Sequence, residues 1–185
     1  MISFLTGTRQ IGKTTWLKEL VPMMQERGIP MWGFITPAVF EGDVKTGIDA
    51  VVYPGGDTFP MATLAEDATR KPFDPSELPP VEKQRPQSHW NFSDEAMDRI
   101  NQNLAGNRGH MPDGAVLLVD ELGPLEMFQG KGIVEAMDIL DAGDFSNAIV
   151  VIRPELMDYA VERWGSVSEG GCETIYPQQK PAFLE

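Results

Sequence analysis

The feature that most constrains this chain is a glycine-rich segment between an apolar run at residues 2–5 and a stretch with helical spacing. The segment matches the pattern G-x-x-x-x-G-K-[ST] and consists of Gly7, Thr8, Arg9, Gln10, Ile11, Gly12, Lys13 and Thr14. Glycines let a backbone turn closely around an anion, and the start of a helix offers unpaired N–H groups with partial positive charge. Between a strand and a helix, this pattern predicts a loop that binds the phosphates of a nucleotide.

The residue types in the loop suggest individual roles. We expect Lys13 to reach the β- and γ-phosphates and the Thr14 hydroxyl to ligate the Mg²⁺ that accompanies a nucleotide. Thr15 would lie in the first helical turn, with a lesser contact to the α-phosphate. Arg9 either touches a phosphate or points to solvent. A chance match of the pattern in an ordinary turn is expected in about one in a hundred chains of this length, before the flanking strand and helix are counted.

Length and charge narrow the classes of protein to consider. The chain has 185 residues, which suits a single α/β domain over residues 1–185, and its net charge of −13 would repel a nucleic-acid backbone or an anionic membrane. A nucleoside triphosphate with Mg²⁺ is therefore the expected ligand, and a protein partner remains open. The amino terminus lacks the features of a signal peptide, so we expect a cytoplasmic protein. One cysteine and two histidines do not suggest a cysteine-rich zinc site or a histidine metal cluster.

Periodicity in the first half predicts a helix, a hairpin and a long loop. Apolar residues recur at helical spacing behind the glycine-rich segment, where Pro22 predicts a kink or a two-part helix. Two β-rich runs, at 32–40 and 47–53, are joined by a turn-forming segment and predict a hairpin in which Pro37 forces a bulge or an edge. A weaker strand is expected at 58–64. The proline-rich stretch at 66–88 predicts a long loop or flap.

In the second half, strands and helices alternate. Ser93 has the position of a helix N-cap, and the apolar run at 115–119 is typical of a strand buried on both faces of a parallel sheet. Helices are expected at 132–140 and 155–164, with strands at 148–152 and 173–176. This alternation predicts a three-layer α/β fold with a mostly parallel central sheet, helices on both faces, and the hairpin after the first helix.

Two acidic residues follow the buried run at 115–119. Ligands bind at the carboxyl edge of such a sheet, so Asp120 is a candidate Mg²⁺ partner that holds the ion through water or through Thr14. Glu121 is a candidate to orient, or accept a proton from, a water that attacks the γ-phosphate. The alternative is that the strand simply ends in solvated acids, which are frequent in so acidic a chain.

The glycine-rich loop together with Val119-Asp120-Glu121-Leu122-Gly123-Pro124-Leu125-Glu126-Met127 resembles the small bacterial and archaeal P-loop nucleoside-triphosphatases. Their pattern at the second motif reads Asp-Glu-Ile-Gly-x-Met-Glu-Leu, and the hairpin segment beginning Gly33-Phe34-Ile35-Thr36-Pro37 is also similar. The order of elements agrees from Ile2 to about Tyr176. The resemblance implies a RecA-like P-loop fold and slow, Mg²⁺-dependent hydrolysis of several nucleoside triphosphates. Arg9 and Ile11 replace a usual proline and valine, and Ala38 replaces a usual glutamate.

The resemblance also places the strand at 147–152 between those at 2–6 and 115–119, with Arg153 at its carboxyl end. Arg153 either contacts the γ-phosphate or the attacking water, or caps a surface helix. Glu126 either orients Lys13 or a water, or fastens a loop by hydrogen bonds. Trp90 adjoins the long loop and is the tryptophan whose role is open.

Three functions remain in competition at this point. The leading one is a nucleoside triphosphatase in which Lys13, Glu121 and Arg153 act on the triphosphate. A small-molecule or nucleotide kinase would instead close residues 66–88 over an acceptor, with Arg70, Lys71, Lys83 and Arg85 meeting phosphates. A nucleotide-switched module that binds a protein partner is the third.

Overall fold

The computed structural model describes residues 1–8, 10–65 and 90–184, and its strands form one nine-stranded sheet. Five strands make the central part in the spatial order β2-β7-β8-β1-β9, and every neighbouring pair among them is parallel. They are β1 (Ile2–Leu5), β2 (Met31–Ile35), β7 (Val116–Leu122), β8 (Asn147–Ile152) and β9 (Cys172–Ile175). The expected position of β8 between β1 and β7 is confirmed. Arg9 and the loop expected at 66–88 lie outside the described residues.

Antiparallel strands extend this sheet beyond β2. They are β3 (Ala38–Glu41), β4 (Val44–Tyr53), β5 (Asp57–Leu64) and β6 (Trp90–Phe92). β3 and β4 form the expected hairpin, but β2 also pairs with β4, so the run expected at 32–40 is two strands. They are separated at Thr36 and Pro37, because proline has no N–H to continue a ladder. Strand β6 pairs with β5 and was not expected from the sequence.

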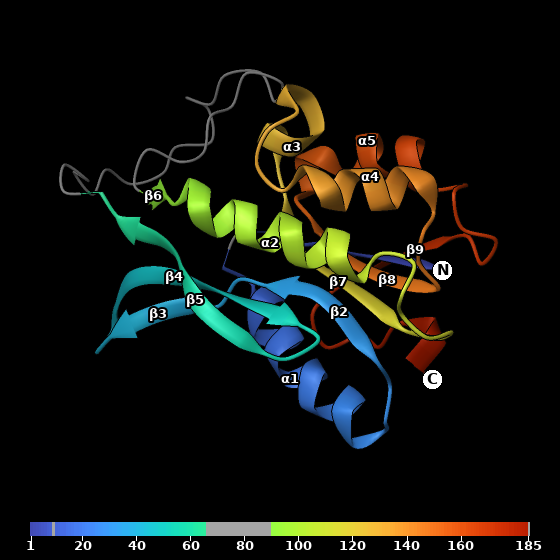
Figure 1. Cartoon of the computed structure of the whole chain (residues 1–185), viewed down its shortest axis with the longest axis horizontal. Coiled ribbons are helices and arrows are strands. Elements are labelled where there is room, and N and C mark those ends of the chain that lie inside the picture. The colour runs from blue at the N-terminus through green and yellow to red at the C-terminus, as the bar shows by residue number, and fades with distance from the viewer. Residues whose placement is uncertain (9, 66–89, 185) are drawn as a thin grey trace.

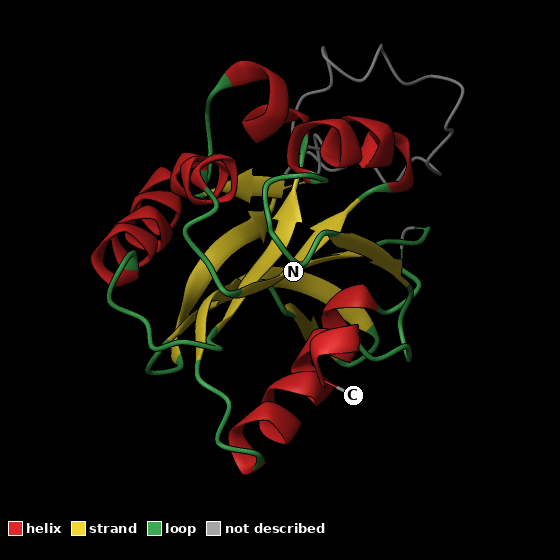
Figure 2. Cartoon of the chain, turned by 90° about the vertical axis from the view of Figure 1, so that its right-hand side faces the viewer, coloured by secondary structure: helices red, strands yellow, loops and turns green. Residues whose placement is uncertain are grey.

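Helices cover both faces of the sheet. Helix α1 (Lys13–Glu26) lies on one face, whereas α2 (Asp94–Asn107), α4 (Val134–Ala142) and α5 (Met157–Trp164) lie on the other (Figures 1 and 2). The short α3 (Pro124–Gln129) and the 3₁₀ turns η3 (Pro154–Leu156) and η4 (Ala182–Leu184) complete the described helices. This is the three-layer α/β arrangement that the sequence predicts. No helix in the described ranges combines the length and the apolar character needed to cross a bilayer.

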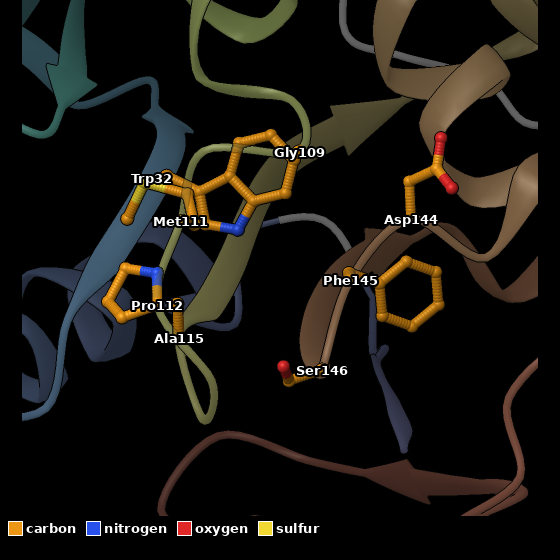
Figure 3. Close-up of a pocket in the computed structure, with 8 residues that line it drawn as sticks. All are labelled: Trp32, Gly109, Met111, Pro112, Ala115, Asp144, Phe145 and Ser146. Carbon is orange, nitrogen blue, oxygen red and sulfur yellow. The ribbon is translucent and has the colours of Figure 1, made fainter.

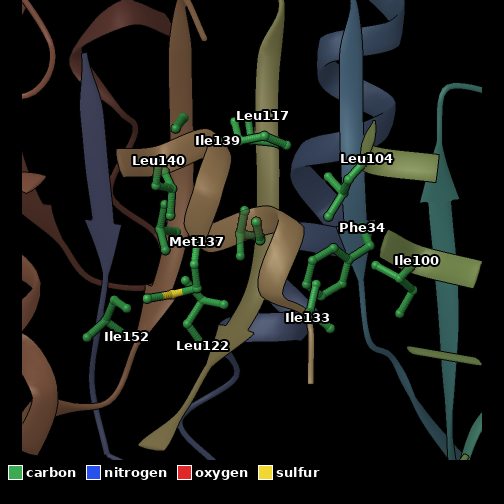
Figure 4. Packing of buried hydrophobic residues seen from close by; sticks show 14 of the residues in the cluster. Phe34, Ile100, Leu104, Leu117, Leu122, Ile133, Met137, Ile139, Leu140 and Ile152 are labelled. Atoms are coloured by element: carbon green, nitrogen blue, oxygen red, sulfur yellow. The ribbon is translucent and has the colours of Figure 1, made fainter. Parts of the chain in front are cut away.

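Strand β7 shows why the apolar run in the middle of the chain is unbroken. Leu117 and Val119 join the apolar cluster under α2 and α4, part of which is drawn in Figure 4. Val116 and Leu118 join the cluster under α1 on the opposite face. Because successive side chains of a strand point to opposite faces, a strand covered on both sides has no position for a solvated side chain.

Three details differ from the sequence-based expectations. Helix α1 is continuous across Pro22, so the two-part alternative is wrong; its buried stripe, which includes Leu17, Leu20 and Met24, packs on the sheet on both sides of that position. Helix α3 was not expected, since its six residues are too few to show a periodicity. Strand β7 runs on to Leu122, so the acidic pair lies inside its last residues, where the register with β8 shifts, and not after its end.

Gly33 is a point where the sheet requires glycine. It lies in β2 with φ of +98°, and a Cβ atom built on it would overlap the carbonyl oxygen of Leu118 in β7. That obstacle is backbone and cannot rotate away. We therefore expect Gly33→Ala to lower the free energy of unfolding by about 2 to 4 kcal/mol, measured by urea denaturation.

Gly42→Ala is the matched control. Gly42 also has a positive φ, +59°, but a Cβ atom added to it in the β3–β4 turn would have no neighbouring atom within 4 Å. Its free energy of unfolding should fall only by the cost of an alanine in the left-handed conformation, about 1 kcal/mol. Equal losses in the two variants would show that the approach of β7 to Gly33 does not matter.

Candidate functional site

The glycine-rich loop lies between β1 and α1 and closes around the ammonium group of Lys13. Gly12 adopts a left-handed conformation with φ of +94° immediately before the first residue of α1. The Lys13 Nζ donates hydrogen bonds to the carbonyl oxygens of Gly7, at 2.8 Å, and Thr8, at 3.1 Å. Burial lowers the pKa of Lys13, while the nearby charges of Glu121 and Asp120 raise it. The ammonium is thus held within its own loop, close to the acidic pair.

Asp120 joins three segments that are far apart in the sequence. Its Oδ1 accepts a hydrogen bond from the Thr14 hydroxyl at 3.2 Å, at the start of α1. Its Oδ2 accepts one from the backbone N–H of Thr36 at 2.9 Å, just after β2, and the Thr36 hydroxyl donates to the Asp120 backbone oxygen at 2.9 Å. The glycine-rich loop and the acidic pair therefore meet at one edge of the sheet, the carboxyl edge of its parallel strands.

The carboxylate of Asp120 is almost completely removed from solvent, with 2% of the residue exposed. Burial raises its pKa to about 6, the charge of Glu121 adds to that effect, and the hydrogen bonds from Thr36 and Thr14 oppose it. A nearby positive charge would therefore stabilise the ionised form of this buried carboxylate.

Glu121 is partly exposed and forms an ion pair with Arg153. The Arg153 Nε donates to the Glu121 Oε1 at 2.5 Å, and 31% of the Glu121 side chain and 24% of the Arg153 side chain are accessible. Arg153 lies directly after β8, next to β7 in the sheet. Arg153 thus lies at the site and is paired with Glu121, and its contact with a γ-phosphate or an attacking water stays a prediction.

Glu126 fastens the loop that follows β7. Its two carboxylate oxygens accept backbone hydrogen bonds from Gly123 at 3.0 Å and from Ile133 at 3.2 Å. Burial raises its pKa, and these hydrogen bonds together with the charge of Arg153 lower it. These contacts correspond to the loop-fastening alternative, and no hydrogen bond joins Glu126 to Lys13 among the described residues.

A pocket of about 280 Å³ opens beside these groups. One part of its wall is polar, and the other part is mostly apolar and comes from the hairpin, β5, β6 and the helices above the sheet. The polar wall includes Thr14, Thr36, Lys45, Asp120, Glu121, Glu126 and Arg153. The apolar wall includes Ile48, Met61, Trp90, Phe92, Met97, Leu125 and Ile133. Among the described residues of the loop at 7–14, only Thr14 lines this pocket.

A second, smaller hollow of about 160 Å³ lies at the opposite end of the strands. It is lined by Trp32, Gly109, Met111, Pro112, Ala115, Asp144, Phe145 and Ser146 (Figure 3). Ala115 and Ser146 precede β7 and β8, so this hollow is at the amino edge of the sheet. None of the residues expected to bind or act on a nucleotide lines it.

Two residues of the site were not identified from the sequence. Thr36 appears there only as part of the hairpin segment, yet it donates two hydrogen bonds that hold Asp120. Lys45 follows the turn of the hairpin by two residues, and nothing in its local sequence distinguishes it from a solvated lysine. The Thr36-Pro37 break in the β run is the signal that could have pointed to Thr36.

The burial of Asp120 predicts that, without bound metal ions, the free energy of unfolding depends on pH. Because its pKa is higher in the folded state than the ordinary value of 3.8, the native state is stabilised when Asp120 is protonated and destabilised as pH rises through about 6. Asp120→Asn should therefore raise the free energy of unfolding at pH 8 by about 1 to 3 kcal/mol, measured with urea and a chelator.

The gain from Asp120→Asn should shrink as the pH is lowered toward 5, because Asp120 in the unsubstituted protein then takes up a proton. Asp144→Asn serves as the control, since Asp144 pairs with Arg108 at the surface. A loss of stability in Asp120→Asn at pH 8 would mean that hydrogen bonding to the charged carboxylate outweighs its burial.

Comparisons with known proteins identify relatives in sequence and solved structures with the same fold. The mouse and bovine "Cancer-related nucleoside-triphosphatase homolog" proteins are 24% and 25% identical over 127 and 141 residues. These matches cover 68% and 74% of this chain, and 61% and 67% of the relatives. The solution structure of a human cancer-related nucleoside triphosphatase shares the fold, with a TM-score of 0.62 at 18% identity, over 98% of this chain and 91% of that one.

The crystal structure of THEP1 from the hyperthermophile Aquifex aeolicus also shares the fold. Its TM-score is 0.60 at 17% identity, and the match covers 96% of this chain and 90% of that one. The model of the NTPase family matches residues 3–182, which include the glycine-rich loop, the acidic pair and Arg153. The chain is therefore a member of the NTPase family.

Proposed function

We propose that this chain hydrolyses nucleoside 5′-triphosphates to the diphosphate and phosphate, slowly and with broad base specificity, at the site formed by residues 7–14, Asp120 and Glu121. The observation that carries the proposal is the 3.2 Å contact between the Thr14 hydroxyl and Asp120. It brings the glycine-rich loop and the acidic pair together at the carboxyl edge of the sheet, which is the arrangement that P-loop triphosphatases require. The family of the chain and the names of its relatives support the same activity.

The donor atoms at this contact fit Mg²⁺. This ion prefers hard oxygen ligands and is usually held by one or two protein groups together with phosphate oxygens and water. The Thr14 hydroxyl and the Asp120 carboxylate would hold it, and a cation there would stabilise the charged form of Asp120, whose pKa is raised by burial. The described ranges contain no cluster of three or more His, Cys, Asp or Glu side chains suited to a metal. When bound, Mg²⁺ neutralises part of the phosphate charge.

The remaining chemistry belongs to side chains of this chain. The backbone N–H groups of the glycine-rich loop and Lys13 bind and orient the phosphates, with Thr15 near the α-phosphate. Glu121 accepts a hydrogen bond from a water and aligns it with the γ-phosphorus. As the water oxygen bonds to phosphorus, the bond to the bridging oxygen breaks and its electron pair leaves with the diphosphate. The proton of the water passes to Glu121, whose carboxylate Arg153 holds in place.

Glu121→Gln tests this assignment. An amide keeps the size of the side chain but is a much weaker base, so turnover of Mg²⁺-ATP should fall by about 10²- to 10⁴-fold. The dissociation constant for Mg²⁺-ATP, measured by calorimetry, should change little, because the phosphates are bound by the loop at 7–14.

Glu19→Gln is the matched control, since Glu19 is an exposed residue of α1 that undergoes the same chemical change. Its turnover should equal that of the unsubstituted protein. Loss of ATP binding in Glu121→Gln would assign Glu121 to the structure of the site, and unchanged turnover would remove it from the mechanism.

A kinase is the second candidate, because the pocket has an apolar wall that a water molecule does not need. Trp90 and Phe92, with Met61 and Met97, would suit a small aromatic acceptor next to the γ-phosphate. The segment expected to close over such an acceptor, with Arg70, Lys71, Lys83 and Arg85, lies outside the described residues.

The two candidates differ in what accepts the phosphoryl group. If water is the acceptor, addition of nucleosides or sugars at millimolar concentration should leave ATP consumption unchanged, and inorganic phosphate should equal the ADP formed. ATP consumption that rises with one added compound, together with ADP in excess of inorganic phosphate, would favour the kinase.

A further inference from the structure

Lys45 is a positively charged residue of the site that the reaction described above does not use. It lies in β4, two residues after the turn of the β3–β4 hairpin, and its side chain lines the pocket together with Thr14, Asp120 and Glu121. The hairpin begins next to Thr36, which is bonded to Asp120. The hairpin that carries Lys45 is therefore linked to the acidic pair through the hydrogen bonds between Thr36 and Asp120.

The three positively charged side chains of the site that the structure describes have different partners. Lys13 is bonded to carbonyl oxygens of its own loop, and Arg153 is paired with Glu121. The ammonium of Lys45 instead lies over the ring of Trp90, with Nζ 4.7 Å from the ring centre. Among the residues that the structure describes, no carboxylate lies within ion-pair distance of Lys45.

The surroundings of Lys45 favour the arrival of a negative group. Burial lowers its pKa, and the charges of Asp120 and Glu121 raise it, so the acidic pair is close enough to act on the ammonium without bonding to it. An aromatic ring is a weaker partner for an ammonium than a phosphate oxygen, because it offers only a quadrupole. The flexible four-carbon stem of lysine allows a change of partner without movement of the strand.

We propose that Lys45 leaves the Trp90 ring and binds the non-bridging oxygens of the γ-phosphate, where it stabilises the charge that develops during phosphoryl transfer. This inference rests on the proposed function, since it needs a triphosphate in the loop at 7–14. Lys45 takes no proton in the reaction. It offsets charge on the γ-phosphoryl group while the bond to the bridging oxygen breaks and the bond to the water oxygen forms. A diphosphate has no γ-phosphate and does not engage it.

The test compares Lys45→Met with Lys45→Arg in the full chain. Methionine keeps an unbranched apolar stem against Trp90 but removes the charge, so the fold should persist, as judged by the urea midpoint. The turnover of Mg²⁺-ATP should fall by about 10²- to 10³-fold in Lys45→Met, the range found when one charge-stabilising donor is removed. Lys45→Arg, which keeps the charge, should recover part of that loss. Lys18→Met in the exposed face of α1 is the control and should be unaffected.

Binding measurements separate a role in the reaction from a structural role. The affinity for Mg²⁺-ADP should stay within about threefold in Lys45→Met, a difference of less than 1 kcal/mol. The affinity for Mg²⁺-ADP with aluminium fluoride, which mimics the transferring phosphoryl group, should fall in proportion to turnover. If ADP binding weakens by the same factor, Lys45 supports the shape of the site and the proposal is wrong. If turnover is unchanged, the proposal is also wrong.

Trp90 gives an independent optical readout. The part of the tryptophan fluorescence that is lost in Trp90→Phe should change when ADP with aluminium fluoride binds, and should not change with ADP alone. The same spectral change should be absent in Lys45→Met. A response to ADP equal to that with aluminium fluoride would contradict a partner change driven by the γ-phosphate.

Glu121→Gln, measured in parallel, distinguishes the two levels of the argument. If Glu121→Gln and Lys45→Met both hydrolyse ATP at the normal rate, the proposed site itself is wrong. If Glu121→Gln does not hydrolyse ATP and Lys45→Met hydrolyses it at the normal rate, the proposed site is supported and only the proposed role of Lys45 is wrong.

Discussion

The burial of Asp120 is the constraint on which the candidate site depends. A carboxylate without solvent must find hydrogen-bond donors, and here they come from Thr14 at the start of α1 and from Thr36 at the end of β2. Satisfying the hydrogen-bonding needs of this one side chain therefore fixes the relative positions of the glycine-rich loop, the beginning of the hairpin and the last residues of β7. The hydrogen bonds that satisfy the buried carboxylate of Asp120 are also the contacts that assemble the site.

The positively charged side chains around Asp120 have partners of different strength. Lys13 is bonded to carbonyl oxygens, Lys45 lies against an aromatic ring, and Arg153 is paired with the partly exposed carboxylate of Glu121. A carbonyl oxygen and an aromatic ring are weaker partners for a cation than a phosphate oxygen, whereas a carboxylate is a charged partner like phosphate. Lys13 and Lys45 are therefore the side chains that gain from exchanging their partners for a phosphate, and Arg153 already has a charged partner.

The parts of the fold that sequence predicted well are those with a strong local signal. The unbroken apolar run of β7 and the N-cap at Ser93 both depend on neighbouring residues alone, and both agree with the structure. The glycine-rich loop and the acidic pair could be located for the same reason, although the roles of their side chains stay predictions.

What the sequence did not reveal depends on tertiary contacts. Strand β6 has three residues and exists because β5 offers an edge to pair with. Thr36 reaches the site because β2 lies beside β7, and Lys45 reaches it because β4 pairs with both β2 and β3. Neither pairing produces a periodic pattern in the sequence. Helix α3 is held in place by the side chain of Glu126, which accepts backbone hydrogen bonds from Gly123 before the helix and from Ile133 after it.

The balance of charge in the pocket has a consequence for how a nucleotide arrives. Among the described residues, three cationic side chains (Lys13, Lys45 and Arg153) and three acidic ones (Asp120, Glu121 and Glu126) line or adjoin it, whereas the whole chain carries a net charge of −13. A polyphosphate approaching from a distance meets a repulsive field and is attracted only close to the cationic side chains and the N–H groups of the glycine-rich loop. Dissolved ions weaken the distant repulsion more than the close attraction, since the screening length is about 8 Å at physiological ionic strength. Moderate salt should thus speed the capture of nucleotide, the reverse of the behaviour of enzymes that steer anionic substrates with a basic surface.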